Sequence, residues 1–145
     1  MSLISVTRLR IRSYRYLPPF VWYSVRSAWQ ARRAGGFLGG KLMGDGRRTY
    51  WTTTAWVDEA AMRAYRNSGA HFTAMRKLLD WCDEASYTHW VQDSAELPDI
   101  KEAHRRVRDE GRLSKVRNPS PAHAAGQTAE PESGLRFGRA FSPAR

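Results

Sequence analysis

The sequence contains a single cysteine, Cys82, among its 145 residues. A lone cysteine excludes an intramolecular disulfide bond and any zinc site built from several cysteines. Long apolar runs are also missing, since no stretch approaches the roughly 18 apolar residues of a membrane-spanning helix. Residues 1–16 place their positive charges after and between apolar residues, which is the wrong order for a secretory signal. We therefore expect a cytoplasmic protein with no membrane partner.

Motifs for nucleotide or metal binding are incomplete. Residues 35–42, GGFLGGKL, carry glycines and Lys41 as a P-loop does, but leucine follows where that motif needs Ser or Thr to hold magnesium. His71 and His89 are 18 residues apart and show no metal-ligand spacing. Acidic residues cluster where helices are expected to begin or end, so they fit capping better than paired catalytic carboxylates.

The chain is basic, with a net charge of +10 at pH 7. The excess is spread along the sequence, with +6 in residues 1–98 and +4 in residues 99–145. No compact basic cluster stands beside aromatic residues that the sequence marks as exposed. A solvated surface with weak attraction to anions explains this charge better than nucleic-acid binding, so nucleic acid is not an expected partner.

Four segments have the pattern of β-strands. Residues 3–12 and 48–57 alternate with a two-residue period, and the second segment is rich in threonine and aromatic residues. Residues 37–43 form a shorter, glycine-rich candidate, joined to the next strand by a tight turn at residues 44–46. Residues 86–91 alternate again and complete the set.

Two helical regions separate these strands. The prolines at 18–19 favour a helix start and the glycines at 35–36 a helix end. Asp58 is a suitable N-cap for a second region, which we expect to run to about Glu84 with an interruption at residues 68–69.

The predicted order, βαββαβ, is the ferredoxin-like α+β plan, a four-stranded antiparallel sheet with helices on one face. We place this domain at residues 1–97. Its uncovered face needs a partner, so we expect two sheets to pair in a homodimer, as in a dimeric α/β barrel. Residues 98–117 predict a charged C-terminal helix and extension. Residues 118–145 predict a flexible basic tail, because they are poor in large apolar residues.

A histidine lies at the interruption of the second helical region. In AYRNSGAHFTAM, residues 64–75, Ser68 is expected to cap the resumed helix and Gly69 to permit the joining backbone. His71 then lies at a helix start, where unpaired N–H groups and the positive dipole end lower its basicity. A neutral imidazole there can accept a proton, donate one or bind a metal. On chemistry alone, local packing of His71 is the simpler interpretation.

Residues 49–75, TYWTTTAWVDEAAMRAYRNSGAHFTAM, resemble a known group of proteins. The run is similar to uncharacterised bacterial proteins related to spheroidene monooxygenase, within the antibiotic-biosynthesis-monooxygenase superfamily of dimeric α/β barrels. The resemblance extends over about residues 1–92. The matching positions are Tyr50-Trp51, Trp56, Asp58, Ala61-Met62, Ser68-Gly69-Ala70-His71 and Ala74-Met75.

This resemblance implies a monooxygenase-like protein that acts on a bulky hydrophobic molecule between the sheet and its helices. Members oxidise polyketide quinols or haem; some need no cofactor and others bind haem. His71 is implied as the acid/base or haem ligand and Asn67 as a hydrogen-bonding partner of substrate or oxygen, although the haem-ligating register falls closer to Met75. The implied substrate-binding residues are Trp51, Trp56, Tyr65 and Arg66.

Two other functions are compatible with the same fold. A non-catalytic small-molecule-binding or interaction module would have a filled interior and His71 hydrogen-bonded to the backbone. A pocket closed to solvent except near His71 would favour the enzyme. Nucleic-acid binding through the sheet shares the strand order, but residues 48–57 are only weakly basic.

Overall fold

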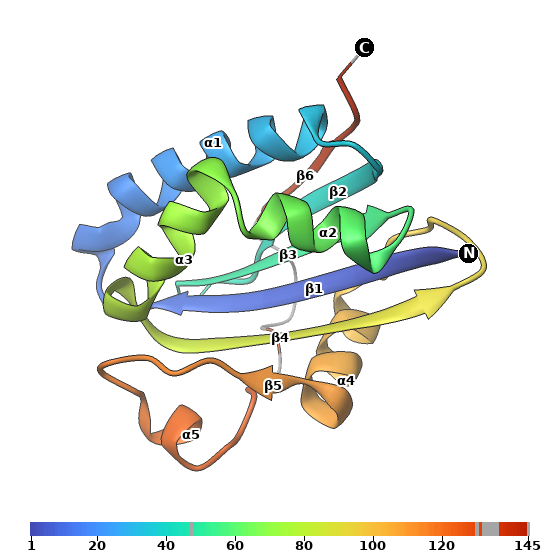
Figure 1. Ribbon diagram of the computed structural model, residues 1–145. Coiled ribbons are helices and arrows are strands. Elements are labelled where there is room, and N and C mark those ends of the chain that lie inside the picture. The colour runs from blue at the N-terminus through green and yellow to red at the C-terminus, as the bar shows by residue number, and fades with distance from the viewer. Residues whose placement is uncertain (47, 130, 132–136, 145) are drawn as a thin grey trace.

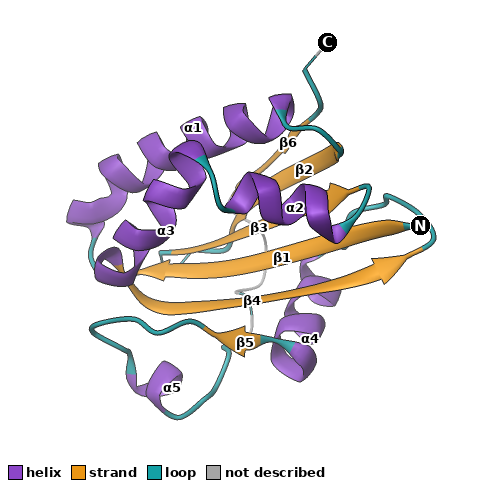
Figure 2. Cartoon of the chain, in the orientation of Figure 1, coloured by secondary structure: helices purple, strands orange, loops and turns teal. Residues whose placement is uncertain are grey.

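A computed structural model describes residues 1–46, 48–129, 131 and 137–144 of the chain (Figures 1 and 2). No helix in these ranges is long and apolar enough to cross a membrane. The elements in chain order are β1 (Ser2–Ile11), a 3-10 helix (Tyr14–Tyr16), α1 (Leu17–Arg33), β2 (Phe37–Gly44), β3 (Thr49–Trp56), α2 (Glu59–Arg66), α3 (Gly69–Trp81), β4 (Cys82–Gln92), α4 (Ile100–Glu110), β5 (Arg112–Leu113), α5 (Pro121–Ala124) and β6 (Phe137–Phe141).

The described strands form one antiparallel sheet in the order β5-β4-β1-β3-β2-β6. β1 lies between β3 and β4, so Leu3 is opposite Trp56 on one side and Val91 on the other. The four central strands have the predicted ferredoxin-like arrangement. The prediction of four strands is corrected to six, because a short strand is added at each edge.

The C-terminal segment supplies both added strands. β5 pairs with β4 and β6 pairs with β2, where Phe141 is opposite Gly40. In the structure, residues 137–141 of the predicted flexible tail form strand β6. An edge strand offers unpaired backbone groups, and Gly40 leaves the space that the ring of Phe141 occupies. Residues 130, 132–136 and 145 of the predicted tail lie outside the described residues.

Helices cover both faces of the sheet rather than one. Figure 1 shows α1, α2 and α3 on one side and α4 on the other. On the α4 side, Ala103 and Val107 pack against a buried apolar group that includes Ile4, Val6 and Trp51. The face that we expected a second copy to cover is thus occupied by α4 of the same chain. The homodimer stays a prediction.

The second helical region ends earlier than predicted. α3 stops at Trp81, and Cys82 begins β4 instead of continuing the helix to Glu84. The position of Cys82 in the sequence fits both the apolar period of α3 and the start of β4. In the structure it is opposite Ile11 of β1. It is fully buried there with Ile11 and Phe20, so pairing with β1 prevails over helical periodicity.

Docking of β6 can be tested through the contact between Gly40 and Phe141. A Cβ at Gly40 would lie 2.3 Å from the ring of Phe141, so Gly40→Ala should lower the free energy of unfolding by about 1–3 kcal/mol. In a Phe141→Ala background the same substitution should cost clearly less, because the ring is gone. Denaturant unfolding of the four proteins measures this coupling. An equal cost in both backgrounds would contradict the docked β6.

Candidate functional site

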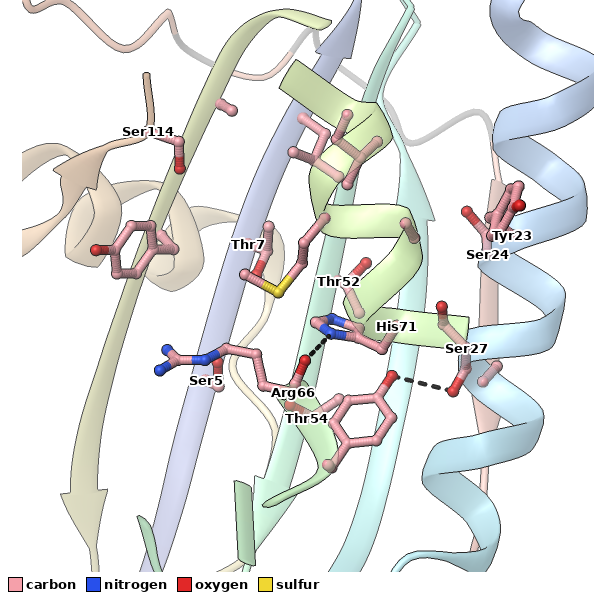
Figure 3. A pocket seen from close by; sticks show the side chains of 18 of the residues that line it. Ser5, Thr7, Tyr23, Ser24, Ser27, Thr52, Thr54, Arg66, His71 and Ser114 are labelled. Atoms are coloured by element: carbon pink, nitrogen blue, oxygen red, sulfur yellow. Dashed lines mark hydrogen bonds between the residues drawn. The ribbon is translucent and has the colours of Figure 1, made fainter. Parts of the chain in front are cut away.

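A cavity of about 580 Å³ lies between the sheet and helices α1, α2 and α3 (Figure 3). This volume is in the range of small-molecule sites. Tyr23, Ser24 and Ser27 line it from α1, and His71 and Met75 line it from α3. The interior of the domain is therefore open at the place where the implied substrate pocket was expected.

The floor of the cavity combines apolar and hydroxyl-bearing side chains. Successive residues of a strand point to opposite faces, so every second residue of β1 and β3 reaches the cavity. Ser5 is directly opposite Thr54, and Thr7 is directly opposite Thr52. These four hydroxyl groups form a polar strip across the two central strands, which gives a bound molecule hydrogen-bonding partners on an otherwise largely apolar floor.

The cavity opens between α3 and the β4–β5 edge of the sheet. Most lining residues are buried or half-buried, but His89, Leu113 and Lys115 at this edge are exposed. Asn67 and Met75, which line the cavity from the end of α2 and from α3, are exposed as well. A molecule from solvent can therefore enter along this edge without displacing the core.

Gln30 of α1 holds the junction between α2 and α3. Its Nε2 donates to the carbonyl oxygens of Tyr65 (3.1 Å) and Ser68 (2.8 Å), and its Oε1 accepts from the backbone N–H of His71 (3.0 Å). Ser68 makes no side-chain cap, and its hydroxyl donates to the carbonyl oxygen of Ala64 instead (2.8 Å). The prediction that Ser68 caps α3 is wrong, because Gln30 supplies the cap from another helix.

His71 is held in one orientation by its neighbours. Its ring lies 4.6 Å from the ring of Tyr65, centre to centre, and its Nδ1 lies 3.2 Å from the carbonyl oxygen of Arg66. A carbonyl oxygen only accepts, so Nδ1 carries the hydrogen and Nε2 keeps its lone pair. No partner for Nε2 is found in the described part of the chain. His71 thus presents a proton-accepting nitrogen to the cavity.

Burial lowers the pKa of His71, and the hydrogen bond to the Arg66 carbonyl opposes this only in part. The direction agrees with the sequence-based expectation, but the main cause is burial rather than the helix start. The imidazole is therefore neutral at pH 7, as a proton acceptor must be.

Tyr65 and Trp56 build the wall next to His71. The ring of Tyr65 stacks on Trp56 at 5.0 Å, and its hydroxyl donates to the carbonyl oxygen of Ser27 (3.0 Å). Trp56 is fully buried, and its Nε1 donates to Thr54 (2.9 Å). Burial raises the pKa of Tyr65, so this hydroxyl stays protonated and serves positioning rather than proton transfer.

Arg66 brings a positive charge to the cavity. Figure 3 shows its side chain reaching from α2 across the floor toward Ser5. Its Nε is buried without a hydrogen-bond partner, and no carboxylate pairs with its guanidinium among the described residues. An unpaired guanidinium next to an apolar cavity favours a bound molecule with an anionic oxygen.

Trp51 does not line this cavity, and its expected placement is corrected. It lies on the opposite face of the sheet, where its Nε1 donates to Asp45 (2.9 Å) and its ring meets His104 of α4 edge-on. Strand alternation separates it from Trp56, which points toward the helices. The other implied site residues line the cavity: Trp56, Tyr65, Arg66, Asn67 and His71.

Two contributions to the site were missed from the sequence. The hydroxyl strip could have been predicted from the two-residue period of the strands. Its Ser and Thr residues share strand faces with apolar residues that are candidates for the core. Gln30 had no comparable signal, because a glutamine on a helix surface is ordinary and its partners lie 35 or more positions away.

Comparison with known proteins identifies the fold. No family model matches the sequence, and no curated protein matches it. Among solved structures, SnoaB, a cofactor-independent oxygenase from Streptomyces nogalater, superposes with a TM-score of 0.54 at 18% identity, over 68% of this chain and 98% of SnoaB. Rv0793 from Mycobacterium tuberculosis gives 0.59 at 11% identity, over 66% of this chain and 100% of the other.

A proposed antibiotic biosynthesis monooxygenase from Nitrosomonas europaea gives 0.57 at 12% identity, over 63% and 89% of the two chains. At these identities the likeness shows the fold alone, which is the α+β ferredoxin-like fold of antibiotic-biosynthesis-monooxygenase-like proteins. The narrower resemblance to spheroidene monooxygenase relatives stays a prediction.

The cap on α3 can be tested at Gln30 and Gly69. Gln30→Met keeps the length of the side chain but removes its hydrogen bonds, so the free energy of unfolding should fall by about 1–3 kcal/mol. Gly69 has φ +59°, and an added Cβ would lie 3.0 Å from Gln30 Oε1, so Gly69→Ala should cost about 1 kcal/mol or more. Urea unfolding measures both. Losses below 0.3 kcal/mol at both positions, about the size of a neutral surface change, would contradict this cap.

The lowered pKa of His71 predicts a stability effect on the acid side. The unfolded chain binds a proton at its ordinary pKa of about 6.5, and the folded chain binds it only at lower pH. The free energy of unfolding should therefore fall as the pH drops below about 6.5, and His71→Gln should weaken this dependence. Urea unfolding between pH 7.5 and about 5 compares the two proteins. Parallel curves would show that His71 is not buried as described.

Proposed function

We propose that this protein is a cofactor-independent oxygenase that acts on a bulky aromatic molecule with an acidic hydroxyl group. The main support is the position of His71, which presents an unprotonated Nε2 to the cavity. The same cavity holds the unpaired guanidinium of Arg66. The likeness in fold to SnoaB supports the reaction class.

In this proposal His71 Nε2 removes a proton from the substrate, and the resulting anion is stabilised by Arg66. The electron-rich anion then reduces dioxygen directly. A C–O bond forms at the activated carbon to give a hydroperoxide, and loss of water leaves a carbonyl group there. A CH₂ group and O₂ thus give C=O and H₂O, so the substrate itself supplies the electrons.

Haem is the alternative that the sequence resemblance left open. His71 Nε2 has the lone pair that an axial ligand needs. The four hydroxyl groups of the cavity floor can bond to oxygen atoms of the proposed substrate, but they find no hydrogen-bonding partner on the face of a porphyrin. The cavity residues therefore fit haem less well than they fit the proposed substrate.

A non-catalytic binding module is the second candidate. The hydrogen bond from His71 to the backbone is the feature expected of it, whereas the unfilled cavity beside His71 does not match the filled interior expected of it. The two observations are compatible with catalysis because the hydrogen bond uses Nδ1 and leaves Nε2 free. Turnover, rather than binding, separates the two candidates.

The test is oxygen uptake by chelator-treated protein with a panel of polycyclic phenols whose keto tautomers carry a ring CH₂ group. His71→Gln should lower kcat by about 10²–10⁴-fold, the usual contribution of a general base. Arg66→Met should raise KM, most strongly for the substrates that ionise. Trp51→Phe is the matched control, because it changes a buried aromatic residue on the other face and should leave both constants unchanged.

Binding of these phenols without oxygen uptake would favour the module. A Soret band that saturates at one haem per chain and disappears in His71→Ala would instead establish a haem protein and contradict the proposal.

A further inference from the structure

The outer side of α1 carries an apolar stripe that the fold does not cover. Val21, Trp22, Val25 and Trp29 are between 47 and 61% exposed. At 3.6 residues per turn these four side chains project within about one third of the helix circumference. The opposite side of α1 holds the buried Phe20 and faces the cavity. Figure 1 shows α1 at the outside of the helical layer. The stripe is therefore a surface feature, separate from the core.

Positive charge surrounds this stripe. The guanidinium of Arg26 lies 5.9 Å from the ring centre of Trp22, and that of Arg33 lies 4.1 Å from the ring centre of Trp29. Residues 1–44 contain no Asp or Glu. We call Val21, Trp22, Val25, Arg26, Trp29 and Arg33 the α1 patch.

The neighbouring helix α3 also exposes apolar and basic side chains. α3 packs beside α1 and exposes Phe72, Arg76 and Lys77. A shallow groove joins the α1 patch to the first residues of α3, Gly69 and Ala70, where the helix dipole is positive. The charge of the α1 patch is complementary to an anionic partner with an apolar layer.

Other occupants fit this surface less well. A second copy would bring Arg26 and Arg33 against the same cations of its partner. Single-stranded nucleic acid stacks its bases on aromatic faces, but the guanidinium of Arg33 already occupies one face of Trp29 at 4.1 Å from the ring centre. Nucleic acid would also leave the two valines without contacts.

We infer that the α1 patch binds the surface of membranes that contain anionic phospholipid. Tryptophan and valine side chains enter the boundary between head groups and acyl chains, and the arginines stay at the level of the phosphates. The helix lies on the membrane and does not cross it. We expected no membrane partner because the sequence lacks a membrane-spanning segment, but binding to the membrane surface does not need one. None of the four apolar side chains lines the cavity, so this inference is independent of the proposed function.

The test is flotation of the full chain with vesicles of phosphatidylglycerol and phosphatidylcholine, compared with vesicles of phosphatidylcholine alone. We expect binding to the anionic vesicles that weakens as salt is added. Trp22→Gln/Trp29→Gln should reduce the apparent affinity by about tenfold or more, because apolar contact is lost. Arg26→Gln/Arg33→Gln should cause a comparable loss, at about fivefold for each arginine.

The matched control is Lys101→Gln/Arg112→Gln, which removes the same charge from exposed positions outside the α1 patch and should bind as the unchanged protein does. Circular dichroism checks that each variant is folded. We expect all of them to fold, because the replaced side chains are exposed. Failure to bind anionic vesicles would overturn the inference, and so would equal losses in the control. Sedimentation that showed self-association through the patch, or binding of an oligonucleotide in place of vesicles, would also overturn it.

Discussion

The amide of Gln30 is the contact on which the candidate site depends. It joins α1 to the break between α2 and α3, donating to two carbonyl oxygens and accepting from the N–H of His71. The left-handed backbone of Gly69 allows the chain to turn beneath it. This bridge fixes where α3 begins, and the start of α3 in turn fixes where His71 points. The carbonyl oxygen of Arg66, from the end of α2, then selects the ring nitrogen that carries the hydrogen.

Strand alternation divides the sheet into two surfaces with different roles. The face toward α1–α3 leaves a cavity whose floor mixes hydroxyl and apolar groups. The face toward α4 is closed, and it contains a buried ion pair between Arg8 and Glu84 at 2.7 Å. Ser120 also donates a hydrogen bond to Glu84 and so ties the C-terminal segment to this face. The chain therefore completes the second face with its own residues and keeps the first face open for a ligand.

Much of this arrangement follows from local sequence signals. The period of two in the strands, the prolines before α1 and the Gly69 break are physical constraints on the backbone, so they predicted the ferredoxin-like core and the position of His71. The exceptions depend on contacts distant in sequence. Cys82 fits a helix or a strand until Ile11 pairs with it, β6 needs the space above Gly40, and α4 covers a face that a second copy could equally cover. The two-residue period of β3 alone shows that Trp51 and Trp56 lie on opposite faces of the sheet.

The proposed chemistry requires His71 to be a neutral base with a free Nε2 directed at a ligand cavity. Long-range ¹H–¹⁵N NMR of the histidine ring nitrogens at neutral pH tests it most directly, with His71→Gln for assignment. We expect Nδ1 of His71 to carry the hydrogen and Nε2 to have the shift of an unprotonated nitrogen. A hydrogen on Nε2, or a ring protonated at both nitrogens, would show that His71 cannot be the proposed base.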